Sequence, residues 1–459
     1  MTNLDITLEH PEYRERRAMW SQYRDLYAGG EQFRAHADHY LVRRQKEPGD
    51  VYGERLLRCF YENYVGSIVD WYTATLFRRE PVITFEGDNV RSKQFFGEFT
   101  EDCDLKGTSF SEFFRRIFGE TLVCGKSFIL VDFPRVDRPA VNRAEEDQQG
   151  ASRAYLVAYS ADELINWSHD EQGHFEWVVL RTRNLKKTKI EDPSWKKQTR
   201  WVYYDKQKYT IYEQTENGPI ESIASGQHAL AKQARVPLVQ LVVSEGLWLL
   251  NKAGSLQLEH FNKSNALGWA ITMGLFAMPV IYSERDWNQV LGESYYIQLG
   301  PQDRFGWTEP EGHVYQIAAD NLARLQEEIY RVCYVTHAGA PLSAGHAQSG
   351  LSKQRDYAIT QEVLRAYGDA VKEAMKRVLR AIEAAREDQL SLDVTGMDEF
   401  DIGDFGTNLD DAERLLKLGI NSPTLTKQVF KKLAFQFLCD TRQEVKDRIS
   451  REIDEAINK

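Results

Sequence analysis

Two histidines are the first residues in this 459-residue sequence whose spacing could support chemistry. His36 and His39 are three residues apart, so both could ligate a metal ion from one face of a helix. No third ligand lies near them in the sequence, and a solvated helix face is the better interpretation. The stretch Gly339–Gly345 has some likeness to a nucleophile elbow, but Pro341 stands where that motif requires its first glycine. We expect neither stretch to be a reactive site.

Other catalytic signatures are missing from the sequence. It contains no GxxxxGKS/T phosphate loop, no GxGxxG and no HExxH. Carboxylates are abundant, but abundance does not identify an acid–base pair. The cysteines are scattered without CxxC spacing, which predicts free thiols in a reducing cytoplasm: Cys59, Cys103, Cys124, Cys333 and Cys439. We therefore expect a protein that is not an enzyme and that uses no cofactor and no metal.

The charge balance narrows the possible partners. Hydrophobic residues make up 42% of the chain and charged residues 28%, and the net charge is −11. A sequence-specific DNA-binding protein usually carries a basic face, so this charge argues against that class. It is compatible with a protein that surrounds DNA without gripping it, because an acidic wall repels phosphates and keeps a duplex mobile. The length predicts about two to four substructures, and no secretory signal is visible.

One segment is apolar enough to need a membrane test. No residue from Ser264 to Ser283 is charged, and the stretch approaches the roughly 20 residues of a transmembrane helix. Polar and glycine residues dilute it, Pro279 interrupts it, and the mean hydropathy of the chain is −0.53. We expect a helix that packs against protein neighbours and runs into a strand, with no membrane span.

The N-terminal half shows helical and then β patterns. Apolar spacing predicts helices over Pro11–Tyr27 and Gly53–Phe77, followed by a strand at residues 82–85. A capping box, Ser109 to Glu112, opens a helix that Gly125 ends, and residues 127–133 form a strand. Residues 142–150 are expected to form a surface loop, and residues 155–243 are β-rich.

Basic residues concentrate inside this β-rich part. Between Arg181 and Lys208 there are ten Lys or Arg and only three Asp or Glu. A solvated hairpin is the favoured interpretation. The alternative is a contact site for an acidic partner, either a neighbouring subunit or nucleic acid.

The C-terminal half returns to helices. The expected order is a helix at 248–275, a strand at 279–282, a helix at 320–337, a loop of small residues from Ala338 and a long helix at 352–386. Leu392–Glu413 holds eight acidic residues and no basic one. The last three helices should begin at Asn408, at Ser422-Pro423 and at Thr441, with Gly419 ending the first of them.

This order of elements, together with several short motifs, resembles the portal proteins of tailed bacteriophages over nearly the whole chain. The N-terminal part shares Trp20…Asp25…Gly29, Tyr40-Leu41, Tyr52-Gly53-Glu54-Arg55 and Phe77-Arg78-Arg79-Glu80-Pro81. The strand Gly125–Pro134 and the landmark Tyr155…Tyr159…Ile165-Asn166-Trp167 follow in the family's order. Near the C-terminus, residues 415–422 match a recurrent pattern of the family's crown.

The resemblance implies an α+β, multidomain portal fold with long stem and tunnel helices, a β-rich wing and a helical C-terminal crown. The implied parts are a wing at 1–247, a first stem helix at 248–275, a clip at 276–317, a second stem helix at 318–337, a tunnel loop at 338–352, a long helix and return strand to the wing at 353–408, and a crown at 409–459.

The resemblance also implies a function. A homo-oligomeric ring, a dodecamer, would stand at one capsid vertex of the virion and would assemble in the host cytoplasm. Double-stranded DNA would pass through it non-specifically during packaging and ejection. The ring would dock the terminase large subunit, head-completion or adaptor proteins, and the major capsid or scaffold protein.

Two groups of residues follow as candidate sites. The tunnel loop would present Ser343, His346, Gln348, Ser349, Ser352, Lys353 and Arg355 to DNA. Stem contacts between subunits would use Leu267, Ile271, Leu325 and Ile329. Another head–tail connector ring, or a nucleic-acid-processing enzyme of phage origin, are the alternative functions.

Overall fold

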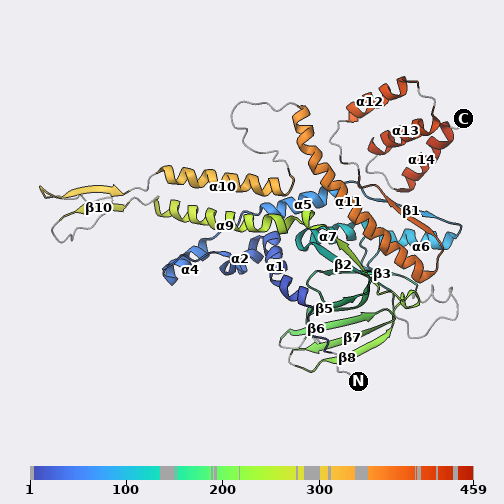
Figure 1. The fold of residues 1–459 in the computed structure, drawn as a ribbon, viewed down its shortest axis with the longest axis horizontal. Helices are drawn as coiled ribbons and strands as arrows, with labels where there is room; N and C mark the ends of the chain where they lie inside the picture. The colour runs from blue at the N-terminus through green and yellow to red at the C-terminus, as the bar shows by residue number, and fades with distance from the viewer. Residues whose placement is uncertain are drawn as a thin grey trace. The chain divides into compact units, whose positions relative to one another are not determined.

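The computed structural model describes most of the chain, and the described part has the expected α+β class (Figure 1). The described residues are 5–134, 150, 152–187, 190, 194–216, 218–274, 278–283, 300–308, 312–335, 350–398, 400, 405–419, 422–437 and 443–457. The chain divides into two compact units. Unit 1 comprises Met1–Gln22, Val69–Trp248 and Gln348–Lys459, and unit 2 comprises Tyr23–Ile68 and Leu249–Ala347. Residues 23–68, which we expected in the wing, therefore cluster with residues 249–347.

A three-stranded antiparallel sheet lies at the centre of unit 1. Strand β2 (Lys126–Asp132) pairs with β3 (Tyr155–Ser160) on one side and with β9 (Leu238–Val242) on the other. Its five middle residues are all buried, because helices α7 (Phe110–Cys124) and α11 (Gly350–Arg386) pack against this sheet. The strand expected at residues 127–133 is confirmed.

Helix α7 begins and ends as the sequence predicts. The Ser109 side chain accepts a hydrogen bond from the backbone N–H of Glu112, at 3.3 Å. This bond satisfies a donor that has no partner inside the helix. At the other end, Gly125 adopts a left-handed conformation with φ of 80°, which glycine enters without a steric penalty.

The β-rich region forms a second sheet in unit 1. Its five antiparallel strands follow one another in sequence order: β4 (Leu164–His169), β5 (Phe175–Lys186), β6 (Lys196–Asp205), β7 (Lys208–Thr215) and β8 (Glu221–Gln227). Two short 3-10 helices, Ala231–Gln233 and Glu245–Leu247, flank β9. The expected meander is confirmed.

A third pair of strands joins distant parts of unit 1. The expected strand is β1 (Val82–Glu86), and it pairs antiparallel with β12 (Ser391–Thr395). Helix α6 (Val90–Glu101) follows β1, and the Asn89 side chain caps it by accepting from the N–H of Ser92.

The N-terminal helices differ from the prediction at one place. Helix α1 (Pro11–Ala28) is confirmed, and the short helices α2 (Gly30–Ala35) and α3 (Ala37–Tyr40) follow. The expected single helix Gly53–Phe77 is wrong, because two helices, α4 (Gly49–Arg58) and α5 (Tyr64–Leu76), replace it.

The break before α5 has a local cause. The chain turns extended at Cys59, and the Asn63 side chain then accepts a hydrogen bond from the N–H of Gly66, at 2.8 Å. An asparagine cap of this kind starts a new helix. Residues 59–63 are thereby left as a non-helical segment.

The central part of unit 2 is a pair of helices joined through a pair of strands. Helices α9 (Leu249–Gly274) and α10 (Gly312–Val332) lie side by side (Figure 1). Strands β10 (Met278–Tyr282) and β11 (Arg304–Thr308) pair antiparallel between them. The first helix and the strand at 279–282 are confirmed. The second helix begins at Gly312, before the expected Asp320, and ends before His337 because Tyr334 adopts a left-handed φ of 59°.

The C-terminal helices are α11, α12 (Phe405–Lys417), α13 (Pro423–Phe437) and α14 (Gln443–Ile457). The long helix α11 is confirmed. The expected cap at Asn408 is wrong, because α12 begins at Phe405 and Asn408 lies inside it. Gly419 has a left-handed φ of 70°, and the Ser422 side chain accepts from the N–H of Leu425, as expected at the start of α13. Thr441 and the loop at 142–149 lie outside the described residues.

Candidate channel and assembly site

Helix α9 organises unit 2, and its end carries the uncharged stretch from Ser264. The helix buries Leu249, Leu250, Ala253 and Phe261. Within the part of the chain that the structure describes, we find no helix with the combination of length and apolar character needed to span a bilayer. The stretch therefore packs as part of a protein helix, as far as its described residues extend.

The two long helices of unit 2 are held by both apolar and polar contacts. Leu325 is 8% exposed and Ile329 is fully buried. The Tyr315 hydroxyl donates to the backbone carbonyl of Ala270, at 3.2 Å. At the other end of the pair, the Lys252 ammonium donates to the Tyr334 hydroxyl at 2.5 Å and lies 4.2 Å from that ring's centre. The helix pair is therefore fixed at several points along its length.

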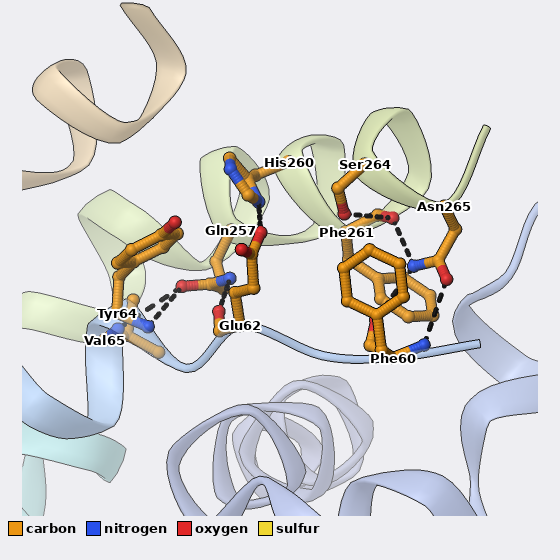
Figure 2. Close-up of polar contacts among 9 residues, drawn as sticks. All are labelled: Phe60, Glu62, Tyr64, Val65, Gln257, His260, Phe261, Ser264 and Asn265. Carbon is orange, nitrogen blue, oxygen red and sulfur yellow. Dashed lines mark hydrogen bonds and ion pairs between the residues drawn. The ribbon is translucent and has the colours of Figure 1, made fainter. Parts of the chain in front are cut away.

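Three amide side chains of α9 fasten the non-helical segments of residues 40–65 to the helix. Asn265 is the clearest case, because its Oδ1 accepts from the N–H of Phe60 at 3.0 Å and its Nδ2 donates to the carbonyl of Phe60 at 2.9 Å (Figure 2). Asn262 does the same for another segment, accepting from the N–H of Val42 at 2.8 Å and donating to the carbonyl of Tyr40 at 3.0 Å. Each amide thus replaces a missing strand neighbour.

Gln257 completes this set of amides. Its Oε1 accepts from the N–H groups of Tyr64 and Val65, at 3.2 and 3.3 Å, and its Nε2 donates to the carbonyl of Glu62 at 2.8 Å (Figure 2). The side chain is fully buried. Buried backbone groups are costly to leave unpaired, so these bonds fix the path of the chain between α4 and α5.

A buried histidine lies in the same seam. His260 is 3% exposed, and its Nδ1 lies 3.5 Å from the Glu62 carboxylate (Figure 2). That Nδ1 has no hydrogen-bond partner in the described part of the chain. Burial lowers the pKa of His260, and the nearby Glu62 charge only partly offsets this effect. The imidazole is therefore held in its neutral form.

The expected stem contacts divide into two groups. Leu325 and Ile329 are buried inside their own chain, so they stabilise the helix pair in place of the subunit contact expected from the sequence. Leu267 is half-buried, and Ile271 is 42% exposed. The last two remain the candidates for contact with a second chain.

The expected tunnel-loop residues lie mostly beyond the described part. Ser343, His346, Gln348 and Ser349 fall outside the described residues. Ser352, Lys353 and Arg355 belong to the first turns of α11, which begins at Gly350. The loop is therefore shorter at this end than the expected boundary at residue 352, since Gly350 already has helical hydrogen bonding.

The two histidines that opened the sequence argument lie in unit 2. His36 is the residue between helices α2 and α3, not on one helix face, and its Nδ1 lies 2.9 Å from Asp25. Asp25 also accepts from the Tyr40 hydroxyl at 2.7 Å. Among the residues that the structure describes, no three His, Cys, Asp or Glu side chains are grouped to hold a metal.

The cysteines that the structure describes are free thiols: Cys59, Cys103, Cys124 and Cys333. Cys439 lies outside the described residues. Burial raises the pKa of Cys103 and of Cys333 to about 12, which keeps both thiols protonated and unreactive.

The amide seam was missed in the sequence. Its only signal was the occurrence of Gln257, Asn262 and Asn265 on a helix that is otherwise apolar or small. Polar side chains at such positions are often buried and bonded to backbone. The pattern could not say to which segment.

Comparisons with known proteins give structural likeness alone. No family model and no curated protein matches the sequence. A chain from the neck of an empty gene transfer agent particle, solved with C6 symmetry, has a TM-score of 0.43 and 14% identity, over 78% of this chain and 87% of that one. A chain from the virion of a native gene transfer agent particle has a TM-score of 0.42 and 13% identity, over 84% and 93%.

A third structure belongs to the same kind of particle. A chain from the neck of a native gene transfer agent particle, solved with C12 symmetry, has a TM-score of 0.40 and 13% identity, over 78% of this chain and 86% of that one. With TM-scores below 0.5 throughout, a function for this chain has to be argued from its own residues and its own order of elements.

Proposed function

We propose that this chain is the subunit of a portal ring, the channel through which a phage-like particle packages and ejects its DNA. One observation carries the proposal, namely the order α9, β10, β11, α10 and α11. A stem helix, a clip, a second stem helix and a long tunnel helix are the parts that the sequence resemblance implies, and these elements follow the same order.

The contacts of unit 2 suit the mechanical role of a stem. Two helices of 26 and 21 residues lie side by side, and a two-stranded ladder joins their ends. The Tyr315 and Lys252 bonds stabilise the pair without a partner chain. The partly exposed Ile271 is then free to contact a neighbouring copy.

The charge of the chain suits a conduit. With a net charge of −11, an assembled ring would hold a polyanion weakly. DNA affinity should be insensitive to sequence and should fall steeply with salt. The partners of such a ring would be the terminase large subunit, head-completion or adaptor proteins, and the capsid or scaffold protein.

The location follows from this role. The ring would assemble in the host cytoplasm and then occupy one capsid vertex of the virion. Other head–tail connector rings share oligomerisation, but they lack a helix–clip–helix order followed by a long helix, and the observed order therefore favours the portal.

Electron microscopy of the purified chain tests the proposal. Negatively stained particles should be rings with a central hole and a flange, and native mass spectrometry should give a single closed oligomer, twelve copies if the resemblance holds. A protein that stays monomeric at low and high salt, or a purified chain with divalent-metal-dependent nuclease or ATPase activity, would contradict it.

A further inference from the structure

Basic residues of the five-stranded sheet are paired at its base and unpaired at the tip of one hairpin. At the base, Arg181 lies 3.0 Å from Glu9, and Lys206 lies 3.2 Å from Asp170. Arg200 pairs with Glu213 across the adjacent strands. These three cations are therefore neutralised inside unit 1.

Four lysines at the tip of the β5–β6 hairpin have no such partners. The side chains of Lys186, Lys187, Lys196 and Lys197 form no ion pair and no hydrogen bond with any residue of the described part. Lys186 and Lys196 even lie directly opposite each other in the strand ladder. Like charges at opposed positions destabilise a strand pair, so the tip is better suited to an acidic surface than to open water.

The same tip exposes apolar side chains. Leu185 and Trp195 are each 63% exposed, and Ile190 is 89% exposed. Grouped apolar residues beside unpaired cations are typical of a protein contact surface. Duplex DNA would neutralise the lysines but would leave these apolar side chains uncovered, so the occupant should be a protein.

The chain itself carries a complementary segment. Residues 397–405 read Met-Asp-Glu-Phe-Asp-Ile-Gly-Asp-Phe, with acidic and large apolar residues in alternation and no basic residue. Of the four acidic residues in this segment, the structure describes Asp398, which is exposed. Helix α11 holds its backbone, because the Arg365 side chain donates to the carbonyl of Asp398.

We propose that the hairpin tip of one copy, residues 185–187 and 195–197, docks on the acidic segment 397–405 of a second copy. Lysines would meet carboxylates, and Trp195 and Leu185 would meet the apolar residues between them. Because tip and segment are different surfaces, the contact is heterologous, and repetition of it around an axis closes a ring. The inference rests on the proposed assembly of copies and names a surface that sustains it.

Charge reversal on each side tests the contact. The tip variant carries Lys186→Glu, Lys187→Glu, Lys196→Glu and Lys197→Glu. The acid variant carries Asp398→Lys, Glu399→Lys, Asp401→Lys and Asp404→Lys. Each variant alone should reduce the assembled fraction at low salt at least tenfold, by native mass spectrometry and sedimentation, because both partner surfaces then carry the same charge.

Restoration is the decisive arm. An equimolar mixture of the two variants should assemble, since every contact in an alternating ring again joins opposite charges. A chain that carries both sets should also assemble alone, which shows that the single variants were folded. The matched control, Lys46→Glu, Lys93→Glu, Lys106→Glu and Lys208→Glu, makes the same charge change elsewhere and should leave assembly unchanged.

The outcomes separate this contact from the ring proposal. If the wild type forms rings and the tip variant forms them equally well, the contact is wrong and the ring stands. If the tip variant fails and neither the mixture nor the combined chain assembles, the occupant is another surface. If rings persist but the tip variant loses affinity for a 30-base-pair duplex, the tip binds nucleic acid and the inference is overturned.

Discussion

The indole nitrogens of Trp20 and Trp248 donate to consecutive backbone carbonyls, those of Cys124 and Val123, at 3.0 and 2.9 Å. Both indoles are buried. The last carbonyls of a helix have no partner inside it, so the two tryptophans satisfy the end of α7 from segments far apart in the sequence. This helix end is therefore a junction on which three parts of unit 1 depend.

Substitution of Gly125 should destabilise that junction. Gly125→Ala places a Cβ 2.8 Å from the Trp248 ring at a residue whose φ is 80°. We expect a loss of at least about 1 kcal/mol and a lower thermal midpoint, measured by circular dichroism. Gly97→Ala is the control, because the space at Gly97 in helix α6 is open. It should raise the midpoint slightly, and an equal effect of both variants would contradict this explanation.

Removal of one amide should loosen the segment between α4 and α5. Asn265→Leu leaves the N–H and the carbonyl of Phe60 without their partner. The expected cost is about 1–3 kcal/mol, with faster proteolytic cleavage at residues 59–63. Gln316→Leu removes a bond on the exposed surface of α10 and serves as the control. Unchanged cleavage in Asn265→Leu would show that the amide does not hold the segment.

The neutral state of His260 predicts a pH dependence of stability. Its pKa in the folded chain lies below the ordinary value of 6.5 because burial disfavours the imidazolium. The unfolded chain therefore binds the proton more tightly, and the stabilisation present above pH 6.5 is lost as the pH falls below it. The thermal midpoint of His260→Gln should fall less than that of the wild type between pH 7 and pH 5. His228→Gln is a necessary comparison, since burial also lowers the pKa of His228.

Ile271 tests the stem contact between copies. Ile271→Glu places a charge on a side chain that is 42% exposed, so the folded subunit should tolerate it while the ring dissociates toward monomer. Native mass spectrometry measures the shift, and an unchanged thermal midpoint of the monomer shows that folding is intact. Val90→Glu, at an apolar residue of α6 that is 76% exposed, is the control. Intact rings in Ile271→Glu would remove this residue from the interface.

Deletion of residues 345–349 tests the tunnel loop. We chose these limits because α11 begins at Gly350, so the deletion leaves every described residue of the helix in place. Rings should form as in the wild type, while DNA packaging or retention in particles should fall. Normally filled, infectious heads would mean that the loop only connects two helices.

Local signals predicted much of the fold, as helix α7 illustrates. Ser109 and Gly125 mark its start and end because a cap and a left-handed residue act within a few positions of the chain. The same is true of Ser422 at the start of α13. Apolar spacing was misleading between Gly53 and Phe77, where the Asn63 cap interrupts a pattern that continues through both helices.

Long-range partners could not be predicted in this way. Asn265 and Phe60 are joined by two hydrogen bonds, but they lie in different thirds of the sequence. Leu325 and Ile329 were expected at a subunit interface because apolar spacing on a helix does not tell which neighbour will cover it. The same limit applied to the lysines of the hairpin tip, whose lack of partners is a property of the folded sheet.

The pairing of β1 with β12 has a consequence for biosynthesis. Residues 82–86 leave the ribosome early, but their strand partner at residues 391–395 is made only after the whole of unit 2. Until then β1 presents an open strand edge, a feature that promotes misassociation between nascent chains. Expression yield should therefore depend on translation rate and chaperone supply between these two strands more than on the stability of the finished protein.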